Sequence, residues 1–198
     1  MKKRVAILIS GRGSNMRALI EAASDPSYPA QIVLVLSNRP DAPGLEAARA
    51  AGIEAIAIDH KDYVRDRAAH EAAIHQALLQ REVEVVCLAG YMRVLTPFLV
   101  RAWAGRMLNI HPSLLPAFPG LDTHARALAA RVREHGCTVH LVTEEMDAGP
   151  IIDQARVSVL PDDDEEALAA RVLEQEHLLY PRALKALADG LTRGSTPN

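Results

Sequence analysis

Two polar side chains, Asn109 and His111, stand where an apolar run of the chain ends. A proline-rich loop follows at once, and Pro112, Pro116 and Pro119 exclude a helix there. Because side chains at alternate positions of an extended segment point the same way, Asn109 and His111 share one face. An amide donor beside an imidazole can stabilise a developing oxyanion and move a proton. The same residues also fit a surface loop that carries a hydrogen-bonded histidine.

A carboxylate that would complement His111 stands in the tight-turn sequence Met146-Asp147-Ala148-Gly149-Pro150. An aspartate close to His111 would hold one ring tautomer and favour the imidazolium. The two residues are far apart in the chain, so the sequence leaves open whether they meet. Asp147 alone fits a turn-forming role. Glu144 and Glu145 are alternative carboxylates that lack the Gly-Pro context.

The segment Ser10-Gly11-Arg12-Gly13-Ser14-Asn15 follows the first apolar run and opens a helical pattern. Small residues let a ligand approach the backbone, and the free amides at a helix start favour an anion. The spacing fits neither the dinucleotide fingerprint nor the P-loop, so it favours a phosphomonoester over NAD or ATP. We also expect Ser14 or Asn15 to cap the helix.

Glu176 lies on the apolar stripe of the last helical pattern, together with Leu168, Val172 and Leu179. A carboxylate on a buried face needs a partner, and a pair of sugar hydroxyls would serve. The alternative is a glutamate in a salt bridge at the edge of the stripe.

The segment Gly90-Tyr91-Met92-Arg93-Val94-Leu95 follows the fourth expected strand. Ligands gather at the carboxyl ends of strands in α/β sheets, so this segment is a candidate receptor for a flat heterocycle. An ordinary strand-to-helix connection is the other interpretation.

The composition, 198 residues of which 49% are hydrophobic, predicts one domain over residues 1–198 with a polar tail at 191–198. A net charge of −3 gives no electrostatic case for a nucleic-acid partner. No apolar run has the length of a membrane span, and the N-terminal one is too short for a signal peptide. Cys87 and Cys137 lie in apolar runs, which indicates buried free thiols and a cytoplasmic protein. The histidines show neither i, i+4 pairs nor a cysteine cluster, so we expect no metal site.

Apolar runs alternate with helical patterns, which predicts an α/β fold: a Rossmann-like, mostly parallel, twisted sheet flanked by helices. An antiparallel extension is expected near the C-terminus. The expected strands are 5–9, 32–36, 53–58, 83–89, 106–110, 137–142 and 151–160. The expected helices are 16–23, 45–51, 62–80, 99–104, 124–134 and 164–187, the last interrupted at Pro181.

These motifs together resemble the glycinamide ribonucleotide formyltransferase family, the folate-dependent formyltransferases of purine synthesis. The resembling segments span the chain in family order: 9–15, Ser37-Asn38, 88–93, 108–116, 146–150 and Gln175-Glu176-His177. Asp122 departs from the family, whose members often carry a histidine or basic residue there.

The resemblance implies a role for each matching residue. Asn109, His111 and Asp147 match the catalytic set. Contacts to the substrate, glycinamide ribonucleotide, are implied for Gly13, Ser14, Asn15, Glu176 and Pro112. Contacts to the co-substrate, 10-formyltetrahydrofolate, are implied for Arg67, Met92, Arg93, Val94, Leu95, Asn109, Val142, Thr143, Glu144, Glu145, Met146 and Asp147. A cis peptide at Leu115-Pro116 is implied as well.

The implied reaction transfers the formyl group to the glycinamide amine through a tetrahedral intermediate. Asn109 and His111 would stabilise this intermediate, with Asp147 orienting His111. The partners are small molecules, and a monomer or a homodimer is expected. A non-catalytic phosphate- or nucleotide-binding module and a formyltetrahydrofolate hydrolase are the alternatives, although the hydrolase carries an extra N-terminal domain. Methionyl-tRNA formyltransferase, which adds a C-terminal domain and a basic surface, fits less well.

Overall fold

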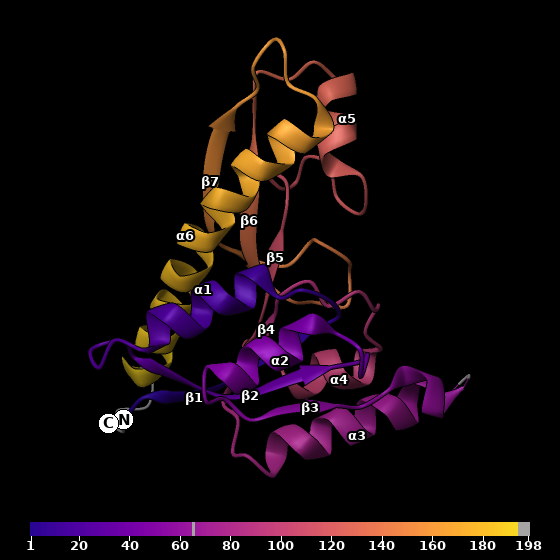
Figure 1. Ribbon diagram of the computed structural model, residues 1–198, viewed down its shortest axis with the longest axis vertical. Helices are drawn as coiled ribbons and strands as arrows, with labels where there is room; N and C mark the ends of the chain where they lie inside the picture. The colour runs from indigo at the N-terminus through magenta and orange to yellow at the C-terminus, as the bar shows by residue number, and fades with distance from the viewer. Residues whose placement is uncertain (65, 194–198) are drawn as a thin grey trace.

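One seven-stranded sheet runs through the molecule in the order β3-β2-β1-β4-β5-β6-β7 (Figure 1). It is seen in a computed structural model that describes residues 1–64 and 66–193. The strands are β1 Lys3–Ile9, β2 Ala30–Ser37, β3 Ala55–Ala57, β4 Val85–Leu88, β5 Met107–His111, β6 Glu134–Leu141 and β7 Ile151–Ser158. The helices are α1 Ser14–Ala23, α2 Pro43–Ala50, the 3-10 turn η1 His60–Tyr63, α3 Arg67–Leu79, α4 Pro97–Ala102, α5 Thr123–Ala129 and α6 Glu165–Arg193.

The first five strands are parallel, and β6 and β7 are antiparallel to their neighbours. This arrangement confirms the predicted mostly parallel sheet with an antiparallel extension. The chain leaves β1 on one side toward β2 and returns on the other side at β4, so the strand order reverses there. In open α/β sheets the crevice beyond such a reversal is where ligands bind.

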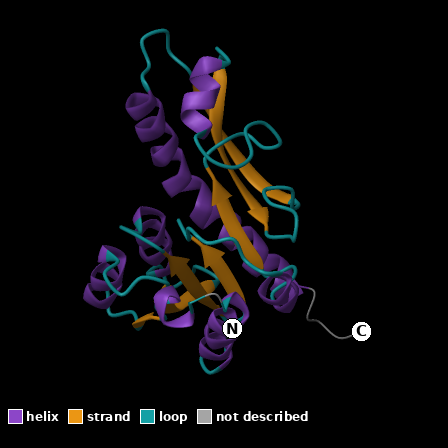
Figure 2. Cartoon of the chain, turned by 90° about the vertical axis from the view of Figure 1, so that its right-hand side faces the viewer, coloured by secondary structure: helices purple, strands orange, loops and turns teal. Residues whose placement is uncertain are grey.

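Helices cover both faces of the sheet, because the side chains of each buried strand alternate between two apolar cores (Figure 2). On one face Val5, Ile7 and Ile9 of β1 pack in the same core as residues of α1, α2 and α6. On the other face Ala6 and Leu8 share a core with residues of α3 and α4. The loops at the carboxyl ends of β1, β4 and β5 therefore project from a rigid frame.

Two predicted helices, 62–80 and 124–134, do not extend over their full predicted lengths, whereas the ends of α1, α2 and α4 shift by one or two residues. The expected helix 62–80 is divided into η1 and α3, because the Asp59 carboxylate accepts from the Lys61 amide and the Asp66 carboxylate accepts from the Ala69 amide. Each aspartate thus starts its own element. The expected helix 124–134 ends at Ala129, since Arg131 has a φ of 51° and Glu134 already begins β6.

Helix α6 corrects the prediction of an interruption at Pro181, because it continues through this proline to Arg193. Tyr180 beside it is fully buried and donates from its hydroxyl to the carbonyls of Leu88 and Leu108. Burial of this helix on the sheet outweighs the hydrogen bond that a proline removes. The predicted tail therefore begins later than residue 191, and residues 194–198 lie outside the described part of the chain.

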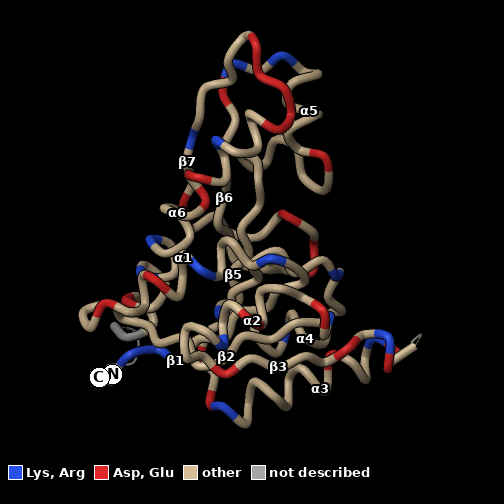
Figure 3. Tube along the Cα trace, viewed as in Figure 1, with Lys and Arg blue, Asp and Glu red and all other residues tan. Residues whose placement is uncertain are grey.

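Charged residues are dispersed along the chain rather than gathered into a basic face (Figure 3). Acidic residues are concentrated in the loop between β7 and α6, where the Asp164 carboxylate accepts from the Ala167 amide at the helix start. Within residues 1–64 and 66–193, no helix combines the length and apolar character needed to cross a membrane.

Candidate active site

Asn109 and His111 lie on β5, and the antiparallel register with β6 decides what faces them. Asn109 pairs with His140 and His111 pairs with Thr138. Side chains of directly paired residues lie on the same side of a sheet, so these four share one surface. His111 is buried, with 5% of its surface exposed, and Asn109 is half-buried.

The structure brings Asp147 to His111 from the turn after β6. Asp147 has a φ of 54°, and its Oδ2 atom lies 3.5 Å from His111 Nδ1. The same oxygen accepts from the Gly120 amide at 2.8 Å, which fixes the carboxylate. His111 Nε2 lies 3.0 Å from the Phe118 carbonyl and must donate to it. The other ring nitrogen, Nδ1, thus faces the Asp147 carboxylate.

His140 belongs to the same cluster, since its Nε2 atom lies 3.3 Å from Asn109 Nδ2 and 3.8 Å from Asp147 Oδ1. It is buried, and burial lowers its pKa, while the hydrogen bond to the Leu141 carbonyl and the Asp147 charge act in the opposite direction. Because His140 Nδ1 donates to Leu141 at 2.9 Å, the neutral ring has a free lone pair on Nε2. Asn109 Nδ2 lies 3.3 Å from that atom. His140 thus holds the Asn109 amide, whose second N–H remains available. The sequence could have indicated this role of His140 only through its pairing with Asn109, and that pairing depends on the β5–β6 register.

The proline-rich loop after β5 is fixed by Thr138 of β6. The Thr138 hydroxyl donates to the Ser113 carbonyl at 2.7 Å and accepts from the Leu115 amide at 3.1 Å. The Leu115-Pro116 peptide is cis, as the resemblance implied. Pro112 is half-buried, and its carbonyl accepts from the Thr123 hydroxyl at 2.7 Å. The loop that follows His111 is therefore held by Thr138 of β6 and by Thr123 of α5.

The glycine-rich loop meets α1 at Gly13, whose φ of 69° is the left-handed conformation that glycine adopts readily. Gly13 is the N-cap residue, and no side chain caps this helix, so the expected capping by Ser14 or Asn15 is wrong. The amides of the first turn consequently have no side-chain acceptor, which suits an anion. The loop is held by α2, because the Gly44 amide donates to the Gly11 carbonyl at 3.0 Å.

Asn15 and Glu176 meet across the molecule. Asn15 Nδ2 donates to Glu176 Oε2 at 2.7 Å, and both residues are buried. Burial raises the pKa of Glu176 to about 7, while the hydrogen bond from Asn15 opposes that shift. Asn15 Oδ1 is buried and accepts no hydrogen bond from any described residue. This pair therefore presents a hydrogen-bond acceptor and a carboxyl group with a pKa of about 7 beside the start of α1.

The segments expected to hold the heterocycle lie after β4 and β6. Met92, Val94 and Met146 are exposed although they are apolar, whereas Leu95 and Val142 pack against the core of α3 and α4. Arg93 is half-buried. Large apolar side chains left in solvent mark binding surfaces.

The polar residues of this region have separate partners. Thr143 donates from its hydroxyl to the Glu145 carbonyl at 3.0 Å. Glu144 pairs with Arg101 of α4 at 2.6 Å. Arg67 is exposed at the start of α3, and within the described chain no hydrogen bond or ion pair links it to residues 92–95. Of the expected residues of this region, the structure places Leu95 and Val142 in one core and Arg67 at the start of α3.

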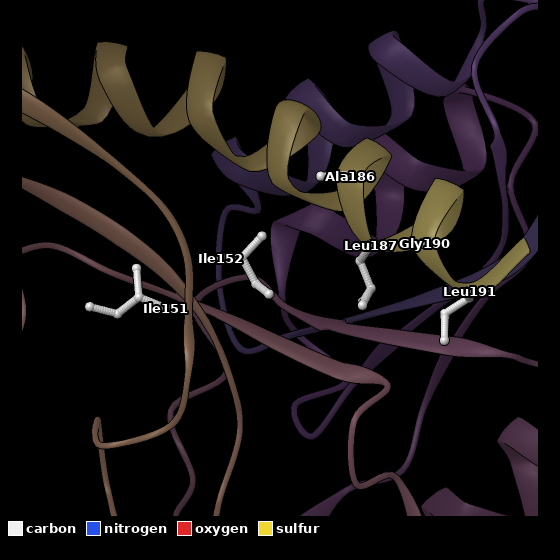
Figure 4. A pocket seen from close by; sticks show the side chains of 6 residues that line it. All are labelled: Ile151, Ile152, Ala186, Leu187, Gly190 and Leu191. Atoms are coloured by element: carbon white, nitrogen blue, oxygen red, sulfur yellow. The ribbon is translucent and has the colours of Figure 1, made fainter. Parts of the chain in front are cut away.

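Two hollows lie outside the Asn109–His111–Asp147 cluster. One of about 950 Å³ lies beside the first turn of α1 and is lined by Arg12, Ser14, Arg17, Ala18, Glu21, Ala22, Pro43, Leu173, His177, Leu178 and Pro181. The other, of about 310 Å³, lies between β7 and the end of α6, where Ile151 and Ile152 approach Leu187 and Leu191 (Figure 4). Its lining side chains are apolar and offer no group for proton transfer. Only the first hollow, which contains Ser14, adjoins the candidate site.

In the described part of the chain, no group of three or more histidine, cysteine, aspartate or glutamate side chains is placed to hold a metal ion. Cys87 and Cys137 are buried free thiols, as predicted.

Comparison with known proteins agrees with this arrangement. The family model described as "Formyl transferase" matches residues 3–184. The phosphoribosylglycinamide formyltransferase of Escherichia coli (strain K12) is 45% identical over 94% of this chain and 87% of that protein. The trifunctional purine biosynthetic protein adenosine-3 of Drosophila melanogaster is 50% identical over 96% of this chain, which spans only 14% of that longer protein.

Solved structures give the same result. The phosphoribosylglycinamide formyltransferase from Brucella melitensis has a TM-score of 0.91 and 54% identity, covering 95% of this chain and 96% of that one. The glycinamide ribonucleotide transformylase 1 from Symbiobacterium toebii has a TM-score of 0.92 and 46% identity, covering 96% and 89%. Sequence, sheet order and fold all agree, and the chain belongs to the formyl transferase family.

Proposed function

We propose that the chain transfers the formyl group of 10-formyltetrahydrofolate to the amine of glycinamide ribonucleotide in purine biosynthesis. The products are formylglycinamide ribonucleotide and tetrahydrofolate. The observation that carries this proposal is the convergence of Asn109, His111 and Asp147 at the carboxyl end of β5, with the carboxylate 3.5 Å from the imidazole. The buried free Cys87 and Cys137 support a cytoplasmic location.

The three side chains divide the chemistry between them. The co-substrate supplies an electrophilic formyl carbon, and the substrate amine forms the new C–N bond to it. The free N–H of Asn109 donates to the formyl oxygen as that atom becomes negative. His111 stabilises the same charge and supplies the proton that the folate nitrogen takes up as its C–N bond breaks. Asp147 stabilises the imidazolium, and the proton lost by the attacking amine returns to this pair.

The ribonucleotide side of the proposal is supported by the start of α1. The amides at Gly13, Ser14 and Asn15 suit the substrate phosphate, and Arg12 and Arg17 in the adjoining hollow add positive charge. The unpartnered Asn15 Oδ1 and the Glu176 carboxyl suit the ribose hydroxyls, since together they offer an acceptor and a proton-bearing group. Pro112 is proposed as a further substrate contact, next to His111 in the chain.

The folate side is supported by residues 92–95 and 142–147. Exposed Met92, Val94 and Met146 offer an apolar surface for a flat ring. Arg67 at the start of α3 is proposed as a contact to the acidic tail of the folate.

Two alternatives remain distinguishable by experiment: a non-catalytic phosphate- or nucleotide-binding module, and a formyltetrahydrofolate hydrolase. The test incubates the protein with 10-formyltetrahydrofolate, with and without glycinamide ribonucleotide, and follows tetrahydrofolate release and formylated ribonucleotide. We expect release only when the ribonucleotide is present, with one formylated product for each folate released. Release without the ribonucleotide would identify a hydrolase, and binding without release would identify the module.

A further inference from the structure

We infer that Glu71, a buried carboxylate on α3, is a positioning residue that sets the shape of the folate-binding segment. This inference rests on the proposed function. The segment concerned is residues 90–96, the connection between β4 and α4, called the 90–96 loop below. Glu71 makes no hydrogen bond or ion pair with the catalytic cluster or the glycine-rich loop, so any effect on folate must pass through the 90–96 loop.

Both carboxylate oxygens of Glu71 accept hydrogen bonds from Thr96, the last residue of that loop. Its Oε1 atom accepts from the Thr96 amide at 2.7 Å, and its Oε2 atom accepts from the Thr96 hydroxyl. Thr96 is the N-cap residue of α4, yet its hydroxyl makes no cap hydrogen bond and donates to Glu71 instead. The Thr96 hydroxyl, which as an N-cap would normally bond to the first turn of α4, instead holds the C-terminal end of the 90–96 loop against Glu71.

Burying the Glu71 carboxylate is energetically unfavourable, because no cation accompanies it. Only 3% of its surface is exposed, and no lysine, arginine or histidine of the described chain lies within 4 Å to form an ion pair with it. Burying a carboxylate without a cation costs several kcal/mol unless hydrogen bonds compensate. Among the described residues, only Thr96 makes hydrogen bonds to the Glu71 side chain, so these bonds must offset the cost of burial.

Ser10, a buried residue directly after β1, holds the N-terminal part of the 90–96 loop in a similar way. The Met92 amide donates to the Ser10 hydroxyl oxygen at 2.8 Å, and that hydroxyl donates to Asn38 Oδ1 at 2.6 Å. Ser10 and Asn38 are both buried. The backbone from Met92 to Thr96 is therefore held by polar contacts at both ends.

Packing of its own side chains fixes only part of the 90–96 loop. Tyr91 and Leu95 pack into the core of α3 and α4, but Met92 and Val94 point outward, with 69% and 59% of their surfaces exposed. An apolar pair in solvent gains nothing from its conformation until a ligand covers it. The hydrogen bonds at Thr96 and Met92 pre-organise this pair, and pre-organisation lowers the cost of binding.

The experiment compares Glu71→Gln, Thr96→Val and the double variant with wild type. Glutamine keeps one acceptor and the volume of the side chain, so the Glu71→Gln variant should fold. We expect the KM for 10-formyltetrahydrofolate to rise about tenfold, which is about 1.4 kcal/mol. The KM for glycinamide ribonucleotide should stay within about twofold of wild type. The double variant should be no worse than the poorer single variant, because both changes weaken the contact between the same two residues.

A matched control separates positioning from general destabilisation. Asp163→Asn weakens the ion pair with Arg171 in the loop before α6, which Figure 1 places at the opposite end of the molecule from α3 and α4. This variant should lose stability without changing either KM. A glutamine oxygen is a weaker acceptor than a carboxylate, so hydrogen exchange at the Thr96 amide should be faster in Glu71→Gln and unchanged in Asp163→Asn.

The possible results distinguish failure of the inference from failure of the proposed function. A folate KM in Glu71→Gln that equals that of an active wild type overturns the inference and leaves the proposed function intact. Equal increases in both KM values would reduce Glu71 to a structural residue and also overturn it. A wild-type protein without formyl transfer removes the proposed function, and with it the inference.

Discussion

The polar cluster at the end of β5 is built from residues that restrict one another's protonation. Burial favours the neutral form of His140, and its only free lone pair faces the Asn109 amide. His111 faces a carbonyl on one side and a carboxylate on the other. One histidine is thereby suited to hold a donor in place and the other to carry a proton. Neighbouring groups of one residue type acquire different roles from their surroundings.

Removing the imidazole tests the first role. His111→Ala should reduce kcat by at least about a hundredfold, in line with measured contributions of general acid–base groups. His75→Ala, which removes a histidine on α3 that accepts from the Trp103 indole, is the matched control and should keep kcat within about threefold. Steady-state turnover with both substrates saturating is the measurement. Near-normal turnover in His111→Ala would exclude this residue from the mechanism.

Removing only the charge of Asp147 tests the second role. Asp147→Asn retains an oxygen that can accept from the Gly120 amide, so the turn should keep its shape. The variant loses the charge that favours the imidazolium of His111, and kcat should fall about ten- to a hundredfold with little change in either KM. Rapid-quench measurement of the formylated product gives the rate. A variant whose kcat matches wild type would show that the 3.5 Å approach has no chemical role.

At the scale of elements, the glycine-rich loop depends on α2 as well as on its own glycines. An added Cβ at Gly44 would lie 2.5 Å from Ile9 Cδ1 and 2.9 Å from the Gly11 carbonyl oxygen. A backbone oxygen cannot move without the loop that contains it. The start of α2 therefore shapes the backbone on which the substrate phosphate is proposed to bind.

Gly44→Ala should consequently raise the KM for glycinamide ribonucleotide about tenfold, and overpacking should cost about 1–3 kcal/mol of stability. Gly190→Ala is the control, because an added Cβ there meets no heavy atom within 4 Å. Its two KM values should match wild type. Initial rates at varied ribonucleotide, combined with urea unfolding, separate the two effects of Gly44→Ala. An unchanged KM would mean that the loop can yield to the extra methyl group.

The sequence predicted individual elements better than the contacts between them. The alternation of Asn109 and His111 and the stripe that contains Glu176 follow from the strand and helix periods, and both are present. The partnership of Asn109 with His140 requires the β5–β6 register, which no local pattern contains. The contact of Glu71 with Thr96 joins a helix face to a loop end, so it too depends on packing. Pro181 misled the prediction because burial of α6 outweighs a local preference.

At the scale of the whole molecule, stability should depend on pH through His135. Only 1% of its surface is exposed, and burial, followed by the charges of His124 and His111, lowers its pKa to about 4. As the pH falls, the unfolded chain takes up a proton near pH 6.5, before the folded chain does. Stability is therefore complete above about pH 6.5 and is lost as the pH falls toward 4.

Between about pH 7 and pH 5 this residue should lower the free energy of unfolding by about 2 kcal/mol. Urea unfolding of wild type and His135→Gln at both values gives the contribution, since glutamine does not titrate. The variant should show a smaller loss over this interval. Identical losses in the two proteins would assign the acid sensitivity to other groups.

The hydrogen bond between Asn15 and Glu176 also has a consequence for synthesis of the protein, because it joins the first helix to the last across 161 positions. A nascent chain exposes Gly13 and its neighbours well before Glu176, so the two partners of this hydrogen bond are synthesised far apart in time. Products terminated before α6 would retain Asn109, His111 and Asp147 while lacking the proposed ribose contact and Tyr180, which bonds to β4 and β5. If the proposed function holds, binding of the ribonucleotide therefore requires that α6 has been synthesised and packed against α1.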